Sequence, residues 1–193
     1  MDNKLLKRKG IALCRILRHT AIKRGIKIDA GGWVKLNDIL SKCNDFKETS
    51  FEDIEYIVRE NNKKRFTLSE ISGEWFIKAN QGHSIKYVKD ELLLTEITDP
   101  EYLPIAVHST YKESISIILK EGLSKMKRNH IHMAKSKNII HGTRKNATAF
   151  INIDVKRAIE DGIKFYESDN GVILSAGVNG IIDSKYFLSI EYK

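Results

Sequence analysis

A short basic segment, Lys127–Met133, contains the residues with the clearest potential for chemistry. Side chains alternate between the two faces of a β-strand, so we expect Arg128, His130 and His132 to share one face, with the apolar residues of the segment pointing into the core. Three cationic or potentially cationic groups on one face favour an anionic ligand. The alternative is a solvated basic strand edge, which is the commoner meaning of this pattern when it stands alone.

Composition limits the class of protein. The chain has 193 residues, 41% of them hydrophobic, which is enough for one large domain or two small ones with a real core. An excess of 33 Lys and Arg over 25 Asp and Glu gives a net charge of +8 and favours a polyanionic partner. We expect a cytoplasmic protein with no membrane contact, because no apolar run approaches about 18 residues. Cys14 and Cys43 are isolated, so no metal site is expected.

The first part of the chain has the apolar spacing of a helix over residues 5–23, and Gly25 is a plausible C-terminal stop. Arg18 and His19 would therefore lie near the end of this first helix. A short extended piece over residues 33–36 and a brief second helix follow.

A third helix and a hairpin complete the first half. Ser50 and Asp53 have the spacing of a capping box, and the aromatic and β-branched runs 65–68 and 75–78 predict a β-hairpin. Three helices followed by a hairpin are typical of a winged-helix domain, which we expect over residues 1–92. The third helix is acidic, so ordinary reading of a nucleic-acid groove by this helix is not expected.

The second half is predicted to be a separate domain over residues 103–193. Both prolines, Pro100 and Pro104, lie at its start, and we place a linker at about 93–102. Many short strands with two small helices indicate an α+β fold rather than a doubly wound sheet. Neither glycine-rich nucleotide-binding motif is present, so a nicotinamide cofactor would not be held in a Rossmann manner.

Short motifs occur along the chain in a fixed order. They are Leu17-Arg18-His19, Lys64-Arg65-Phe66, Ala79-Asn80-Gln81-Gly82-His83-Ser84, His108-Ser109-Thr110 and Asn170-Gly171-Val172. Together with the basic segment they resemble the RNA 2'-phosphotransferase (KptA/Tpt) family, over nearly the whole chain. Members of that family use NAD to remove an internal 2'-phosphate from RNA. The resemblance implies an ADP-ribosyltransferase-like split β-sheet in the second domain, with NAD bound there as a co-substrate.

The resemblance also implies roles for individual residues. The implied catalytic residues are Arg18, His19, Arg65 and Arg128. Guanidinium groups suit this role because they bind phosphate bidentately and remain charged. The implied NAD-binding residues are His108, Ser109, Thr110, His130, His132, Gly142 and Arg144. Ser109 stands where the family has Gly, which adds a side chain near the ligand. Because Arg128 alone of the four follows the linker, we expect the site to form between the two domains.

The implied reaction passes through a 2'-phospho-ADP-ribosyl RNA to 2'-hydroxyl RNA, nicotinamide and ADP-ribose 1'',2''-cyclic phosphate. The expected partners are RNA carrying a 2'-phosphate and NAD, and the expected state is a monomer. One alternative is an ADP-ribosyltransferase acting on phosphate ends of nucleic acid. A second is a non-enzymatic winged-helix nucleic-acid-binding protein, which would bind RNA but release no nicotinamide from NAD.

Overall fold

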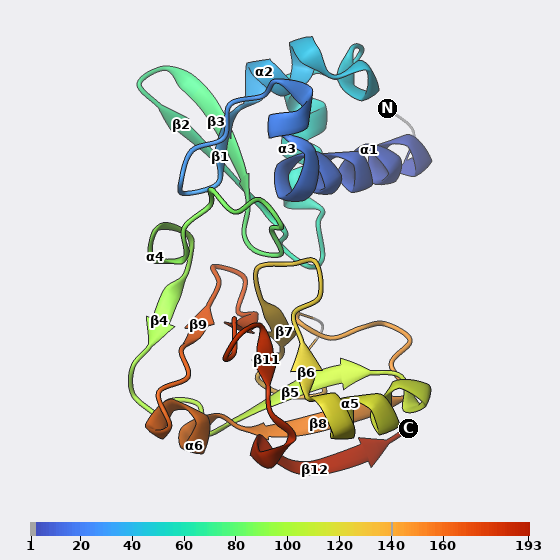
Figure 1. The fold of residues 1–193 in the computed structure, drawn as a ribbon. Helices are drawn as coiled ribbons and strands as arrows, with labels where there is room; N and C mark the ends of the chain where they lie inside the picture. Colours follow the sequence, from blue (N-terminus) through green and yellow to red (C-terminus); the bar gives the residue numbers. More distant parts are fainter. Residues whose placement is uncertain (1–2, 140) are drawn as a thin grey trace. The chain divides into compact units, whose positions relative to one another are not determined.

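The computed structural model describes residues 3–139 and 141–193. The chain divides into two compact units, Met1–Leu93 and Leu94–Lys193, and each is described by itself (Figure 1). The expected linker at 93–102 is partly wrong, because Thr95–Ile97 forms strand β4, which pairs with a strand of the second unit. Burial of Ile97 in the core of that unit accounts for the difference.

The helical region at the start of the first unit changes geometry along its length. An α-helix, α1 (Asn3–Arg15), continues into a π-helical turn, η1 (Ile16–Thr20), in which the Ala21 N–H donates to the Ile16 carbonyl at 2.9 Å. A 3₁₀ turn, η2 (Ile22–Arg24), follows and ends at Gly25, whose φ of 68° is the left-handed conformation that glycine adopts without strain. The predicted helix and its glycine stop are therefore confirmed, but its uniform α-geometry is not.

The third helix begins as the sequence predicts. The Ser50 hydroxyl accepts the Asp53 N–H at 3.3 Å, and the Asp53 carboxylate accepts the Ser50 N–H at 3.1 Å. This capping box satisfies two backbone donors at the start of α3. The remaining helices of the unit are α2 (Leu36–Lys42), η3 (Asn44–Phe46), α3 (Phe51–Arg59) and α4 (Asp90–Leu93).

A three-stranded antiparallel sheet packs with these helices in the order β1-β3-β2. The predicted hairpin is confirmed, and its turn has positive φ at Ser72 (52°) and Gly73 (78°), as a tight hairpin turn between two twisted strands requires. The strands are β1 (Trp33–Lys35), β2 (Phe66–Ile71) and β3 (Glu74–Ala79).

The second unit contains short antiparallel strands and small helices, which confirms the α+β class. Its sheets have the orders β4-β9-β10-β7, β12-β8-β5 and β11-β6. The strands are β4 (Thr95–Ile97), β5 (Ile105–Thr110), β6 (Leu123–Ser124), β7 (Ile131–Met133), β8 (Ala149–Asp154), β9 (Phe165–Glu167), β10 (Ile173–Ser175), β11 (Ile181–Ile182) and β12 (Phe187–Tyr192). The helices are η4 (Lys112–Ser114), α5 (Ile115–Glu121), α6 (Val155–Glu160) and η5 (Ser184–Tyr186).

Two of these sheets are joined next to the predicted site residues. Val107 of β5 and Ala134, the residue after β7, exchange backbone hydrogen bonds at 2.8 and 2.9 Å. This bridge brings the two strands together at the positions that carry His108 and His132. No helix in the described part of the chain combines the length and the apolar character needed to span a membrane.

The basic segment Lys127–Met133 is only partly a strand. Ile131 and Met133 are buried, as predicted, but β7 begins at Ile131 because β10 offers paired positions only for Ile131–Met133. Arg128 lies in the preceding turn, where its N–H donates to the Lys125 carbonyl at 3.2 Å. The prediction that Arg128, His130 and His132 share one strand face is therefore wrong.

Candidate active site

In the first unit, the segment Ala79–Ser84 contacts two of the predicted catalytic residues. The Ser84 N–H donates to the Arg18 carbonyl at 2.9 Å, and the Ser84 hydroxyl lies 2.9 Å from Nδ1 of His19. Arg18 and His19 belong to the π-helical turn, so this segment fixes both the backbone of the turn and the His19 ring. The contact with Ser84 therefore orients the imidazole ring of His19.

Gly82 allows the Arg18 side chain to lie close to the same segment. The φ of Gly82 is 87°, and a Cβ there would lie 3.3 Å from Cζ and Nε of Arg18. A side chain at this position would press on the guanidinium group and would also strain the backbone. The absence of a side chain at residue 82 therefore helps to set the position of Arg18.

Arg65 is held by two asparagines. Its N–H and its Nη1 both donate to Oδ1 of Asn61, at 3.1 and 3.2 Å. Its carbonyl accepts the Asn80 N–H at 2.9 Å. The buried Asn80 side chain in turn donates to the Lys64 carbonyl at 2.9 Å and accepts from Thr67 Oγ1 at 2.7 Å. The segment Ala79–Ser84 thus contacts Arg18, His19 and Arg65.

Positive charge is concentrated beside Arg65. Partial burial and, second, the charge of Arg65 lower the pKa of the Lys63 ammonium group. An anion bound here would relieve the repulsion between these groups. The role of Asn61 was missed in the sequence analysis, although an asparagine shortly after a helix end is a common acceptor for local backbone donors.

In the second unit, the His108 ring is oriented by the neighbouring strand. Its Nδ1 donates to the His132 carbonyl at 2.8 Å. Burial, and to a smaller extent the Arg144 charge, lowers the pKa of His108 to about 4, although the hydrogen bond to His132 opposes the shift. The ring is therefore neutral near pH 7, and its Nε2 is a hydrogen-bond acceptor.

The Ser109 hydroxyl has a structural role. Its Oγ accepts the Arg144 N–H at 2.8 Å, so the side chain points to the 142–144 segment. Gly142 in that segment has a φ of 84°, and a Cβ there would lie 2.4 Å from the Met133 carbonyl oxygen. Arg144 is thereby held against β5, and Gly142 lies against β7. The Arg144 guanidinium lies 5.4 Å from the centre of the Tyr111 ring.

The other predicted NAD-binding residues differ in their surroundings. Thr110 is buried at the end of β5, where its carbonyl accepts the Thr148 N–H at 3.0 Å. His132 is half-buried, and its Nδ1 donates to the His130 carbonyl at 3.0 Å. His130 is buried beside the Tyr166 ring, with ring centres 6.2 Å apart. The structure thus brings His108 and His132 together and gives His130 a different environment.

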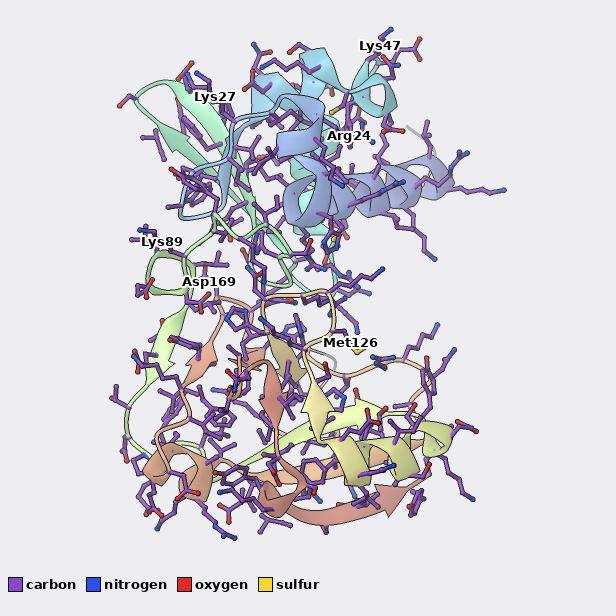
Figure 2. All side chains as sticks on the ribbon, in the orientation of Figure 1. Arg24, Lys27, Lys47, Lys89, Met126 and Asp169 are labelled. Carbon is purple, nitrogen blue, oxygen red and sulfur yellow. The ribbon has the colours of Figure 1, made fainter. Side chains whose placement is uncertain are left out.

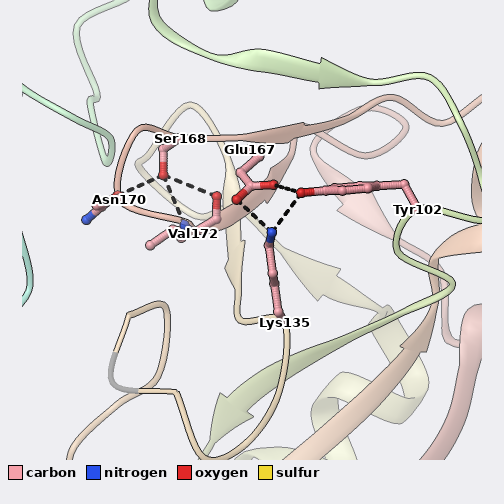
Figure 3. Close-up of polar contacts among 6 residues, drawn as sticks. All are labelled: Tyr102, Lys135, Glu167, Ser168, Asn170 and Val172. Atoms are coloured by element: carbon pink, nitrogen blue, oxygen red, sulfur yellow. Dashed lines mark hydrogen bonds and ion pairs between the residues drawn. The ribbon is translucent and has the colours of Figure 1, made fainter.

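A polar network that sequence reasoning missed connects three segments of the second unit (Figure 3). Lys135 donates to the Tyr102 hydroxyl at 2.9 Å and forms an ion pair with Glu167 at 2.8 Å, and Tyr102 donates to Glu167 at 2.9 Å. The hydrogen bonds to Glu167 and, second, to Tyr102 raise the pKa of Lys135. The network fixes the chain entering β5 relative to β9.

The turn after β9 is also closed by side-chain hydrogen bonds. The Ser168 hydroxyl donates to Asn170 Oδ1 at 2.8 Å and accepts the Val172 N–H at 3.1 Å (Figure 3). Both Ser168 and Asn170 are buried, so the turn at 168–171 is held by hydrogen bonds that are shielded from water. Within residues 3–139 and 141–193, no group of three His, Cys, Asp or Glu side chains is arranged to hold a metal ion.

Each unit therefore contains a group of histidine and arginine side chains held by backbone and side-chain hydrogen bonds, which is typical of an enzyme that handles phosphate groups. The family model described as RNA 2'-phosphotransferase, Tpt1 / KptA family, matches residues 6–177. The chain belongs to this family of transferases.

Named relatives agree with this assignment. A putative tRNA 2'-phosphotransferase of Schizosaccharomyces pombe is 45% identical over 184 residues, which cover 93% of this chain and 50% of that protein. A tRNA 2'-phosphotransferase 1 of Danio rerio is 37% identical, covering 91% of this chain and 81% of that protein. The tRNA 2'-phosphotransferase of Saccharomyces cerevisiae is also 37% identical, covering 86% and 77%. The chain thus spans about half the length of the first of these relatives and most of the other two.

Proposed function

We propose that the protein is an NAD-dependent RNA 2'-phosphotransferase that removes an internal 2'-phosphate from RNA. The observation that carries the proposal is the arrangement of Arg18, His19 and Arg65 around one segment, Ala79–Ser84, in a chain of this family. The proposed products are 2'-hydroxyl RNA, nicotinamide and ADP-ribose 1'',2''-cyclic phosphate. The substrate is of the kind left at a tRNA splice junction.

The first unit is proposed to be a winged-helix domain that binds the RNA phosphate. Its three helices, followed by a hairpin that pairs with β1, support this assignment. Arg18 and Arg65 would bind the phosphate through their guanidinium groups, and His19 would exchange a proton with it through Nε2. The net positive charge of the chain favours association with RNA.

The second unit is proposed to be an ADP-ribosyltransferase-like domain that binds NAD. A neutral His108 with Nδ1 committed to the His132 carbonyl leaves Nε2 as an acceptor, which suits a ribose hydroxyl. His132 on β7 and the 142–144 segment beside it would supply further contacts to NAD. Ser109 and Thr110 would fix the backbone at the end of β5. Arg144 is a cation suited to the NAD diphosphate.

The proposed reaction has two transfers. First, a phosphate oxygen bonds to the anomeric carbon of the nicotinamide ribose as the bond to nicotinamide breaks. Next, a neighbouring ribose hydroxyl attacks the phosphorus and the bond to the RNA 2'-oxygen breaks, and His19 would supply the proton that this oxygen takes up. Charge collects on the non-bridging oxygens in the second transfer, where Arg65 and Arg128 would stabilise it.

A defined RNA tests this proposal. The protein is incubated with NAD and a synthetic RNA that carries one internal 2'-phosphate, with the unphosphorylated RNA as control, and the products are resolved by mass spectrometry. We expect 2'-hydroxyl RNA and equimolar nicotinamide with the first RNA and neither with the control. Intact 2'-phosphate after prolonged incubation with excess protein would refute the proposal. Accumulation of an ADP-ribosylated RNA end would instead support a terminal ADP-ribosyltransferase. Cytoplasmic location and a monomeric state remain predictions from the sequence.

A further inference from the structure

A groove lies between α1 and α3 in the first unit. Of the residues that line it, the proposed chemistry uses only Arg65. Its volume is about 500 Å³, and it is lined by residues of both helices and of the segment that follows α3. The helices approach closely at Gly10, where a Cβ would lie 3.5 Å from Cγ2 of Ile57. Arg65 lines the groove together with Asn61, which binds the Arg65 guanidinium. The groove is therefore continuous with a predicted phosphate-binding residue.

The charge on α1 favours an anionic occupant. The helix contains no acidic residue, and its exposed side chains include Lys4, Lys7 and Arg8. Long nitrogen-tipped side chains extend from this helix in Figure 2. Lys7 lines the groove itself. Glu60 also lines it, but its carboxylate forms an ion pair with Arg59 at 3.1 Å, which offsets its charge.

The apolar part of the lining is suited to a nucleobase. Ile11 is 65% exposed and lines the groove from α1, and the half-buried Tyr56 lines it from α3. Single-stranded RNA is bound in proteins by aromatic and aliphatic surfaces that contact bases, next to cations that contact the backbone. The groove offers both, within one unit of the chain.

We infer that this groove binds the single-stranded RNA next to the 2'-phosphate, with Lys7 on a backbone phosphate and a base against Tyr56 and Ile11. The inference rests on the proposed function, because it takes Arg65 to bind the 2'-phosphate. It adds a place for the neighbouring nucleotide and predicts that part of the affinity for RNA comes from outside the catalytic residues. Binding by this groove needs neither NAD nor turnover.

An exposed pair of isoleucines provides a matched test. Ile11→Glu places a negative charge in the groove, and Ile117→Glu places the same charge on α5 in the second unit, at a residue 60% exposed. Binding of a fluorescent 2'-phosphorylated RNA is measured by anisotropy without NAD, after circular dichroism shows that both variants are folded. We expect Ile11→Glu to raise the Kd at least about fivefold relative to Ile117→Glu, as for the loss of an ionic contact. Equal Kd values for the two variants would overturn the inference.

The salt dependence separates a phosphate contact from other effects. Lys7→Ala should lower the slope of log K against log salt by about one, because one fewer counterion is released. Lys47→Ala, at an exposed position that does not line the groove, should leave the slope unchanged. An unchanged slope for Lys7→Ala would count against the phosphate contact and hence against the inference.

A native thiol in the groove gives a direct readout. Cys14 lines the groove and is half-buried, whereas Cys43 is buried elsewhere in the same unit and serves as an internal control. Saturating RNA should slow alkylation of Cys14 in the unmodified protein, and NAD alone should not, as followed by mass spectrometry. If RNA binds and the Cys14 rate stays the same, the RNA lies elsewhere. All these measurements omit turnover. If RNA protects Cys14 but the protein leaves the 2'-phosphate intact in the presence of NAD, the proposed function is refuted and RNA binding in the groove is supported.

Discussion

Nδ1 of His108 donates a hydrogen bond to the carbonyl oxygen of His132 at 2.8 Å. Because a carbonyl oxygen can only accept, the proton of the neutral ring is fixed on Nδ1 and the lone pair on Nε2. One backbone contact between two strands thus decides which kind of ligand group His108 can bind. The same contact is possible because β5 and the end of β7 are bridged at Val107 and Ala134.

Acid should destabilise the protein through His108. Its pKa in the folded protein is lowered from the ordinary 6.5 to about 4, so the unfolded chain binds the proton at higher pH than the folded chain does. The resulting contribution to the free energy of unfolding is complete above about pH 6.5 and is lost as the pH falls towards 4. It amounts to at most about 3 kcal/mol, because the ring is partly exposed to solvent. In His108→Gln, which does not titrate, urea unfolding at pH 7 and pH 4.5 should differ less than in wild type. His141→Gln is the control and should follow wild type. If His108→Gln shows the wild-type difference, the ring is not the source.

Removal of the Ser84 hydroxyl should slow turnover without weakening RNA binding. Ser84→Ala deletes the contact to Nδ1 of His19 but keeps the backbone bond from residue 84 to the Arg18 carbonyl. One hydrogen bond is worth about 1 kcal/mol, so kcat should fall about fivefold while KM for RNA stays nearly constant. Ser84→Thr should restore most of the rate, and the control Ser69→Ala, at a half-buried position on β2, should have no effect. A rise in KM with unchanged kcat would show that Ser84 acts in binding and not through His19.

Loss of Arg65 or Arg128 should affect the second transfer more than the first. In Arg65→Lys and Arg128→Ala the overall rate should fall about 10²- to 10³-fold, as for loss of a charge-stabilising donor, and a 2'-phospho-ADP-ribosyl RNA should accumulate. Lysine should not replace Arg65, because it lacks the planar fork of donors. Gel analysis of single-turnover reactions detects the accumulated species. Arg157→Ala removes an exposed arginine on α6 of the second unit and should be near wild type. Equal slowing of both transfers would indicate that Arg65 and Arg128 only bind substrate.

Gly142→Ala should weaken NAD binding by displacing the 142–144 segment. Its Cβ would lie 2.4 Å from the Met133 carbonyl oxygen, so the backbone must move, at a cost of about 1–3 kcal/mol. Gly162→Ala is a matched control, because Gly162 has a similar φ of 88° but nothing within 4 Å of its Cβ position. Thermal unfolding and the KM for NAD should change more in Gly142→Ala than in Gly162→Ala. Equal changes would mean that backbone strain at positive φ, and not the contact with Met133, explains the effect.

The sequence predicted most helices and strands because their signals are local. The capping box at Ser50, the hairpin around Ser72-Gly73 and the stop at Gly25 each depend on a few adjacent residues. The short strands β4, β6 and β11 were missed because two or three residues have no detectable period and are defined by their partners. The prediction that Arg128, His130 and His132 share one strand face was wrong for the same reason, since β10 determines where β7 starts.

Sequence motifs identified most residues of the candidate site, but they did not predict the hydrogen bonds that connect these residues. Asn80 bonds to Arg65, which lies 15 positions away in the sequence, and Ser84 bonds to His19, which lies 65 positions away. No local sequence pattern indicates contacts over such separations. Asn61 and the Tyr102–Lys135–Glu167 network carried no motif and were found only in the structure. Their residue types occur on many solvated surfaces, so composition alone could not distinguish them.

The π-helical turn Ile16–Thr20 is equivalent to one residue inserted into an α-helix. Deleting a residue between Ile16 and Thr20 would let the helix close into ordinary α-geometry, and the side chains beyond the deletion would rotate by about 100° relative to α1, the angle between successive residues. The direction of Arg18 and His19 thus depends on chain length as well as on residue type. A protein with both residues but one position fewer in this turn would keep the sequence motif and lose the orientation of the two side chains. A search for functional relatives should therefore compare the number of residues between Arg15 and Gly25 before it compares residue types.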